Sequence, residues 1–108
     1  MYVENVKSQM RKGMLEYCIM LLLCDKPYYT SDIIEKLEKA NLIVVEGTLY
    51  PLLSRLRKEG LLDYEWQESP SGPPRKYYRL TDEGKAVLAA LDENWTLLSG
   101  TVEGIKAL

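Results

Sequence analysis

Residues 69–81 constrain the fold more than any other part of the chain. Their first half is a cluster of proline, glycine and serine, which predicts a turn or loop. Their second half is basic and aromatic, and the preceding residues 62–67 alternate apolar or aromatic side chains with polar ones, as half-buried strands do. The sequence therefore predicts two antiparallel strands joined by a tip that is followed by basic residues.

The chain of 108 residues is long enough for one globular domain and too short for two. It contains no histidine, and its two cysteines, Cys18 and Cys24, lie in an apolar stretch, so we expect reduced core thiols and not a Cys/His zinc site. The sequence also lacks a glycine-rich phosphate loop and a cluster of metal-ligand residues. We therefore expect a protein that is not an enzyme and that needs neither cofactor nor metal.

The most hydrophobic run covers residues 14–24. It contains Glu16 and is shorter than the roughly 20 residues that a membrane-spanning helix needs, so we expect a buried helix and no membrane partner. The N-terminus does not show the basic region, apolar stretch and small-residue cleavage site of a signal peptide. We accordingly expect a cytoplasmic protein.

The formal net charge of −2 is a weak argument against nucleic-acid binding, but the charges are unevenly distributed. Acidic residues outnumber basic ones after Leu80, whereas six cations lie between residues 55 and 79: Arg55, Arg57, Lys58, Arg75, Lys76 and Arg79. A small domain with such a basic end can still present a cationic face to phosphates.

Residues 46–59, closed by Gly60, carry apolar side chains at helical spacing, and these predict a helix with Leu49, Leu52, Leu53 and Leu56 facing inward. The outward positions are then Gly47, Pro51, Ser54, Arg55 and Lys58, flanked by Thr48, Tyr50 and Arg57. A solvated face on a core helix would explain these charges equally well in isolation. The basic hairpin that follows favours an interface with nucleic acid.

Two further helices are predicted upstream. Residues 10–23 form the first, which Pro27 prevents from continuing, and the second starts at an N-cap provided by Thr30 or Ser31 and runs to about Ala40. Its inner face consists of Ile33, Ile34, Leu37 and Ala40, and Asn41 is a suitable left-handed exit. Residues 42–45 are short and β-branched, and fit either an apolar plug or a brief edge strand.

The last helix is predicted to start after Thr81, which can cap it, with acidic residues in its first turn. Its apolar residues recur at alternating steps of three and four, and the N-terminal residues show the same steps. We expect the two seams to pack across a two-fold dimer, through Val6, Met10, Leu88, Leu91, Trp95, Leu98, Val102 and Ile105. The alternative is that both helices fold back onto their own core.

The chain resembles the PadR family of winged helix-turn-helix transcriptional regulators in the order and spacing of three segments, residues 47–56, 59–62 and 72–84. The resemblance covers most of the chain from Met10 to about Leu91. It implies an α+β fold that is mainly α with a small β-hairpin, a winged helix-turn-helix with a C-terminal dimerisation helix. Residues 1–80 would then form the DNA-binding region, and residues 81–108 the dimerisation helix packed with the N-terminal helix in one structural domain.

The resemblance further implies a homodimeric repressor that binds double-stranded DNA at a pseudo-palindromic operator. Thr48, Tyr50 and Arg55 would belong to the recognition helix, and Arg75 and Lys76 to the wing. The chemistry of the residues agrees, because phosphates attract cations and hydroxyls while base edges suit an arginine fork. The complete set expected at the DNA is Thr48, Tyr50, Pro51, Ser54, Arg55, Lys58, Arg75, Lys76 and Tyr77.

The chain is expected to end soon after its last helix, and in this it resembles the short-tailed branch of the family. The multidrug-sensing members of that branch bind planar aromatic compounds between paired tryptophans. Trp95 occupies the matching position, and a small planar hydrophobic effector is therefore a possible partner. The candidate lining residues are Trp95, Leu91, Leu88, Tyr17 and Met14, whose flexible and aromatic side chains make adaptable walls. The alternative is that Trp95 only fills the dimer core.

A second class of function also fits the sequence. A winged helix can serve as a protein-association module, in which case the basic hairpin binds an acidic protein. Such a module would show no salt-dependent affinity for DNA, whereas a DNA-binding protein would lose affinity as salt rises.

Overall fold

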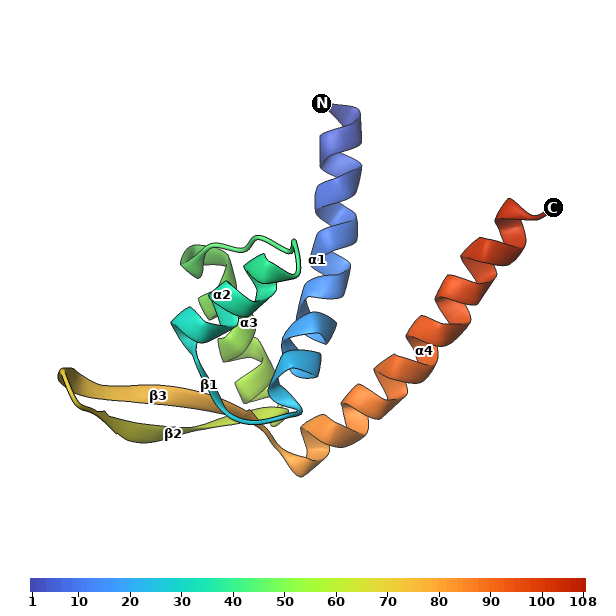
Figure 1. The fold of residues 1–108 in the computed structure, drawn as a ribbon. Coiled ribbons are helices and arrows are strands. Elements are labelled where there is room, and N and C mark those ends of the chain that lie inside the picture. The colour runs from blue at the N-terminus through green and yellow to red at the C-terminus, as the bar shows by residue number, and fades with distance from the viewer.

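A computed structural model describes all residues, 1–108, and consists of four helices and a small antiparallel sheet (Figure 1). The α+β class predicted from the sequence is confirmed. The elements in chain order are α1 (Tyr2–Leu23), β1 (Tyr28–Tyr29), α2 (Thr30–Lys39), α3 (Glu46–Lys58), β2 (Leu62–Ser69), β3 (Gly72–Leu80) and α4 (Asp82–Lys106).

Helix α1 is longer than the apolar pattern predicted, since it begins at Tyr2 and not near Met10. Only its second half is buried, through Leu15, Ile19, Met20 and Leu23. The expectation of two core thiols is wrong for Cys24, because the helix ends at Leu23 and leaves that thiol exposed. Cys18 is half-buried and packs against the core, and this burial raises the pKa of its thiol.

Strand β1 is only two residues long, and the sequence did not predict it. It pairs with β3, Tyr28 opposite Tyr78 and Tyr29 opposite Tyr77. Because the sheet holds these residues extended, α2 begins immediately after them, at Thr30. The predicted N-caps Thr30 and Ser31 are therefore wrong: Tyr29 is the cap, and its backbone N–H donates to the Asp32 carboxylate at 3.3 Å.

The connection from α2 to α3 is a loop and not a strand. Asn41 has a φ of 65°, as predicted for the exit from α2, while Ala40 is exposed and does not belong to the inner face of that helix. Val44 is buried and is the residue that fills the gap, whereas its neighbours Ile43 and Val45 are exposed. Of the two possibilities for residues 42–45, the apolar plug is the one observed.

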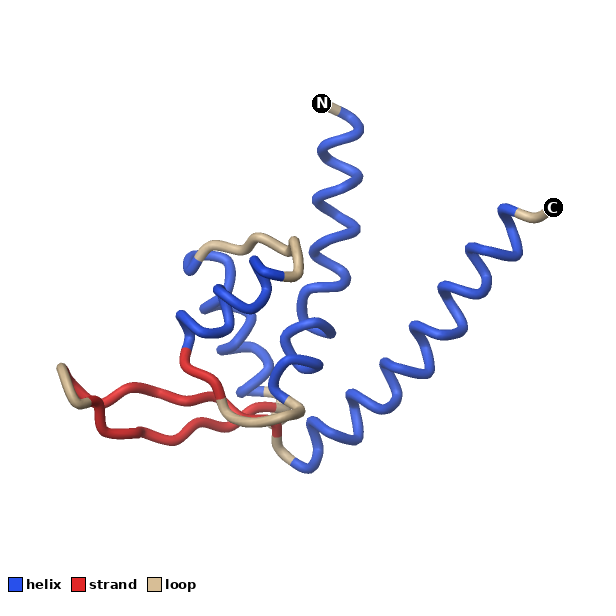
Figure 2. The backbone as a smooth tube through the Cα atoms, viewed as in Figure 1, coloured by secondary structure: helices blue, strands red, loops and turns tan.

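The sheet has the order β1-β3-β2, and its two long strands form the hairpin (Figure 2). The register places Leu62 opposite Leu80 and Trp66 opposite Lys76, and it shifts between Gln67 and Ser69 near the turn. Both strands extend further toward the tip than predicted. The hairpin projects away from the helices on the side opposite to α4 (Figure 1).

A single core joins the base of the sheet to the four helices. From α3 it receives Leu49, Leu53 and Leu56, as predicted, while Leu52 is only half-buried at the edge of this core. Gly60 ends the segment after α3 with a φ of 79°, a conformation that glycine adopts without strain.

The base of the hairpin and the first turn of α4 are locked together. The backbone N–H of Thr81 donates to the carbonyl of Leu61 at 3.1 Å, and its hydroxyl donates to the carbonyl of Gly60 at 2.7 Å. The same hydroxyl oxygen accepts from the N–H of Gly84 at 3.0 Å, which confirms Thr81 as the N-cap. A side chain at Gly84 would lie 2.2 Å from the Leu61 carbonyl oxygen, so only glycine fits.

Helix α4 leaves this junction at an angle to α1, and its second half extends away from the core (Figure 1). The Cα radius of gyration of 15.8 Å exceeds the value of about 13 Å expected for a compact chain of this length. Of the 25 residues of α4, only Gly84 and Leu88 are buried, so most of this helix is open to solvent. Neither α1 nor α4, the two long helices, has an apolar stretch sufficient to cross a lipid bilayer.

The close contact at Gly84 generates a stability prediction. Gly84→Ala should lower the free energy of unfolding by about 2 kcal/mol, because overpacking against the Leu61 carbonyl outweighs the gain in helix propensity. Gly100→Ala is the matched control in the same helix, where an added methyl group meets no atom within 4 Å, and should raise that free energy by roughly 0.5–1 kcal/mol. Urea denaturation measures both. Equal effects of the two substitutions would contradict the contact.

Candidate nucleic-acid interface

Helix α3 presents a polar, largely unobstructed outer face. Gly47, Thr48, Pro51, Ser54 and Lys58 are all exposed, as is the flanking Tyr50, while the opposite face is fixed in the core. This is the division that the apolar spacing predicted. An α-helix held from behind in this way can enter a groove of a duplex without losing its own packing.

Pro51 lies inside α3, beyond the first turn of this helix. Proline has no N–H, so the carbonyl of Gly47, four residues earlier, lacks its usual intrahelical donor. Both residues are exposed, and a Cβ added at Gly47 would meet no atom within 4 Å. The outer face of α3 therefore offers a free backbone acceptor as well as hydroxyls and cations.

Arg55 does not extend freely from α3. Its guanidinium forms an ion pair with Glu16 of α1, although 60% of the arginine side chain remains exposed. Sequence reasoning missed this pair because no local pattern connects residues 39 positions apart. Any partner that binds Arg55 must compete with the Glu16 carboxylate or accept the arginine while the carboxylate holds it.

The hairpin has two chemically different faces, because successive side chains of a strand point to opposite sides. Residues 62, 64, 66, 76, 78 and 80 share what we call the helix-side face, the face that packs on α3 at the base. Residues 63, 65, 67, 75, 77 and 79 share the outer face. Arg75 and Lys76, expected together at the wing, therefore lie on different faces.

Lys76 belongs to a cluster of aromatic rings on the helix-side face. Its ammonium nitrogen lies 4.5 Å from the ring centre of Tyr64 and 5.6 Å from that of Trp66. Tyr64 also packs edge-on against Trp66 at 6.1 Å, and Arg57 of α3 lies 5.1 Å from its ring centre. The sequence analysis does not assign Trp66, Tyr64 or Arg57 to the interface. The alternation of residues 62–67 is the signal that could have placed Tyr64 and Trp66 together on one face of the hairpin.

The outer face is balanced in charge. Arg79 donates to Asp63 at 3.1 Å, and this hydrogen bond is the main reason why the pKa of the Asp63 carboxyl lies below its usual value. Arg75 lies over the ring of Tyr29 at 4.8 Å. Tyr77, expected at the DNA, is half-buried and packs on the same ring at 6.0 Å. Of the cations on this face, Arg75 is the one without a carboxylate in contact.

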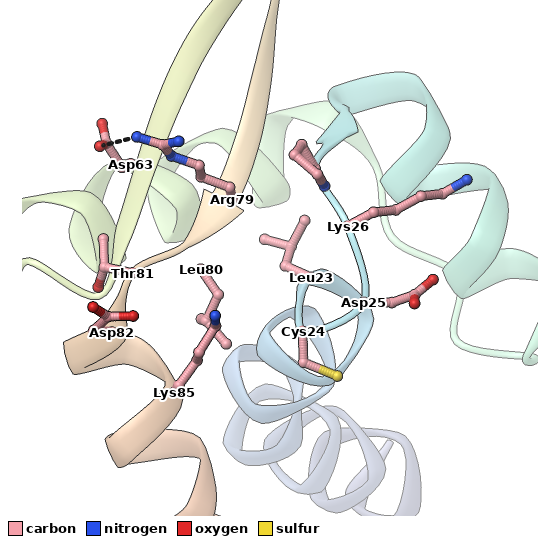
Figure 3. Close-up of a pocket in the computed structure, with 11 residues that line it drawn as sticks. Leu23, Cys24, Asp25, Lys26, Asp63, Arg79, Leu80, Thr81, Asp82 and Lys85 are labelled. Carbon is pink, nitrogen blue, oxygen red and sulfur yellow. Dashed lines mark hydrogen bonds and ion pairs between the residues drawn. The ribbon is translucent and has the colours of Figure 1, made fainter.

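A polar cleft of about 490 Å³ lies where the end of α1, the base of the hairpin and the start of α4 meet (Figure 3). Three cations and three carboxylates line it, and one of each is the Arg79–Asp63 pair. The others are Lys26, Lys85, Asp25 and Asp82. Because the charges cancel, the cleft has no preference for an anion or a cation.

The residues expected at an effector site occupy different environments. Leu88 is buried in the core of its own protomer, so it is not open to a ligand or a second subunit, and Leu91 is half-buried against the same core. Met14 and Tyr17 are half-buried on α1. The Tyr17 hydroxyl donates to Asp92 at 2.5 Å, and this bond is the main reason why the pKa of the phenol is raised to about 12.

Beyond Leu91, the apolar seam of α4 is open to solvent. Trp95 is 44% exposed, Leu98 50%, Val102 44% and Ile105 61%. We call these four residues the α4 stripe. On α1, Met10 is also exposed, and Val6 is half-buried. Single exposed apolar residues are ordinary, but a continuous stripe of this kind marks an interaction site in soluble proteins.

Comparison with known proteins agrees with this geometry. Residues 19–90 match the family described as Transcriptional regulator PadR-like family, which includes α2, α3 and the hairpin completely. A protein of Lysinibacillus sphaericus is 31% identical over 93 residues, which cover 83% of this chain and 85% of the relative.

Two solved structures are also similar. A PadR-like transcription factor from Bacteroides fragilis is 65% identical, with a TM-score of 0.80 over 94% of this chain and 98% of the other. A PadR-like transcriptional regulator from Bacillus cereus is 39% identical, with a TM-score of 0.82 over 90% and 95% of the two chains. The predicted winged helix-turn-helix architecture is therefore confirmed.

Proposed function

Because the chain belongs to the PadR-like family of transcriptional regulators, which bind DNA, we propose that it acts as a homodimeric repressor of a pseudo-palindromic operator. In this proposal α3 enters the major groove and the hairpin contacts the flanking backbone. Transcription regulators of this family are not enzymes, and the proposed activity consists of binding alone.

The observation that carries this proposal is the combination of a free polar face on α3 with a hairpin whose helix-side face carries Lys76 beside the rings of Tyr64 and Trp66. Within residues 62–66 and 76–80, the helix-side face has Lys76 and no carboxylate, and Arg57 of α3 extends the positive charge. The chain as a whole is acidic, so the local positive charge of α3 and the hairpin, and not the net charge, would direct a duplex to these two elements.

The dimer is supported by the α4 stripe. A second copy related by a two-fold axis would cover the exposed indole and aliphatic side chains of both subunits at once. It would also hold two copies of α3 at a fixed distance, and a dimer of that kind reads two half-sites related by the same symmetry. We therefore propose that residues 1–80 form the DNA-binding region and that residues 81–108 form the dimerisation helix, which packs with the N-terminal helix.

Footprinting on the DNA upstream of the protein's own gene tests the proposal. Two protected half-sites should appear with centres about 10 base pairs, or a multiple of that, apart. Val102→Asp, which places a charge in the α4 stripe, should convert the dimer to monomer in sedimentation and abolish both footprints. Ala89→Asp adds the same charge to an exposed position on the opposite side of α4 and should change neither. A single half-site footprint, or a dimer that survives Val102→Asp, would contradict the proposed assembly.

Arg55 provides a test of base reading. If its guanidinium binds a guanine, Arg55→Ala should cost roughly 1–3 kcal/mol on the operator and much less on a scrambled duplex, whereas equal losses indicate a phosphate contact. Glu16→Gln should tighten binding by about 1.5-fold to fivefold, because it frees Arg55 from an exposed ion pair. Glu103→Gln, the control at the far end of α4, removes the same charge and should have a smaller effect. Unchanged affinity in both Arg55→Ala and Glu16→Gln would remove Arg55 from the interface.

We further propose that a planar hydrophobic effector binds at the dimer axis, against Trp95 and its symmetry mate. Trp95 is the large aromatic member of the α4 stripe, and Leu91 precedes it by one turn of the same helix. Met14 and Tyr17 lie on α1, which reaches this part of α4 through the hydrogen bond from Tyr17 to Asp92, and all three residues remain partly exposed. Binding there would change how the two subunits pack, and so the spacing of the two α3 helices. The coupling must be reciprocal, with DNA weakening the effector by the factor by which the effector weakens DNA.

Titration with planar aromatic dyes, followed by tryptophan fluorescence, tests this site. Quenching should occur in the wild-type protein and disappear in Trp95→Ala, in which Trp66 remains as the reporter of any other site. Sedimentation confirms that the variant is still dimeric. Quenching that persists in Trp95→Ala would locate the dye near Trp66 and contradict the proposal.

A further inference from the structure

Trp66 is the most exposed large aromatic residue of the hairpin, with 61% of its surface open to solvent. The residues below it on the helix-side face are progressively covered, since Tyr64 is half-buried and Tyr78 is buried. The hairpin thus carries an aromatic row that starts in the core and ends in an open indole. Packing in the core accounts for Tyr78 and Tyr64, but it does not account for an exposed aromatic side chain at position 66.

The indole is held in place from within the protein. Tyr64 packs edge-on against it at 6.1 Å, and Lys76, its partner in the register, lies 5.6 Å from its ring. These contacts cover part of the side chain and restrict its rotamers, so that little conformational entropy remains to be lost when a partner binds. Trp66 therefore combines contacts with Tyr64 and Lys76 on one side with an apolar surface that is open to solvent.

The charges around Trp66 indicate which partner fits. On the helix-side face the indole has Lys76 beside it and Arg57 further toward α3, and no carboxylate lies between them. Of the two acidic residues of β2 closest to Trp66, Glu65 points to the outer face and accepts a hydrogen bond from Gln67 at 3.1 Å. The other, Glu68, lies beyond Trp66 toward the tip, where the register shifts, and is exposed. A partner at this surface must offer an anion for Lys76 and, directly beside it, an apolar surface for the indole.

The DNA backbone has this combination, because each phosphate is attached to a deoxyribose whose ring presents C–H groups. We infer that Trp66 is a DNA-contacting residue of the wing, with its indole packed on a backbone sugar and Lys76 on the adjoining phosphate. The inference rests on the proposed DNA-binding role and adds a non-ionic contact to it. It also separates Lys76 from Arg75, which lies on the other face of the hairpin.

Affinity measurements as a function of salt distinguish the two kinds of contact. Covering roughly 55 Å² of apolar indole surface corresponds to about tenfold in the dissociation constant, so Trp66→Ala should weaken operator and random duplex alike by about that factor. The salt slope should not change, since no charge is removed. Lys76→Met should instead reduce the slope by about one. Gln67→Ala, the matched control next to Trp66 on the outer face, should leave affinity and slope unchanged.

Fluorescence gives an independent readout. DNA should shift the emission of the wild-type protein and protect it from acrylamide, and both effects should be lost in Trp66→Phe, where Trp95 is the remaining indole. That variant keeps an aromatic ring and should retain part of the affinity lost in Trp66→Ala.

Three results would overturn the inference. Wild-type affinity in Trp66→Ala would show that the indole does not touch DNA. Loss of dimerisation in that variant, seen by sedimentation without DNA, would assign the indole to a protein interface. If the wild-type protein binds no duplex at all, the proposed function fails together with the inference. This result can be told apart from the first two because it is seen in the wild-type protein, without any substitution.

Discussion

The first turn of α4 lies so close to the base of the hairpin that no side chain fits at Gly84, and the rest of the structure depends on this contact. Thr81 binds Gly60, Leu61 and Gly84 at once, so the end of α3, the start of β2 and the start of α4 share one network of hydrogen bonds. The direction in which α4 leaves is therefore fixed relative to α3. A change in packing at the distant α4 stripe can in this way alter the position of the proposed recognition helix.

Helix α1 provides a second connection between the same two helices. Two neighbouring residues on α1 point to different partners: Glu16 pairs with Arg55 of α3, and Tyr17 binds Asp92 of α4. Both contacts are polar and lie near the surface, so each contributes little to stability on its own. Two consecutive residues of α1 thus contact Arg55, the exposed cation of α3, and Asp92, which lies on α4 next to the proposed effector site.

The sequence predicted the elements whose signals are local. The Pro/Gly/Ser cluster located the hairpin, apolar spacing identified the inner face of α3, and Thr81 marked the start of α4. It failed where a contact between distant residues decided the outcome: pairing with β3 made residues 28–29 a strand and moved the cap of α2 to Tyr29. Strand alternation separates Arg75 from Lys76 and brings Trp66 to Lys76, which becomes evident once the register is known. Leu88 continues the α4 pattern but points into its own core.

We propose that this chain, despite a net charge of −2, binds DNA through the cations of α3 and of the hairpin. The most direct test is the dissociation constant for operator and random duplexes, measured over a range of salt concentrations. If cations of the protein contact phosphates, the logarithm of the affinity should fall linearly with the logarithm of the salt concentration on both duplexes, and binding to the operator should be tighter. Affinity that does not depend on salt, or no affinity at low salt, would contradict the proposal and favour a protein-association module.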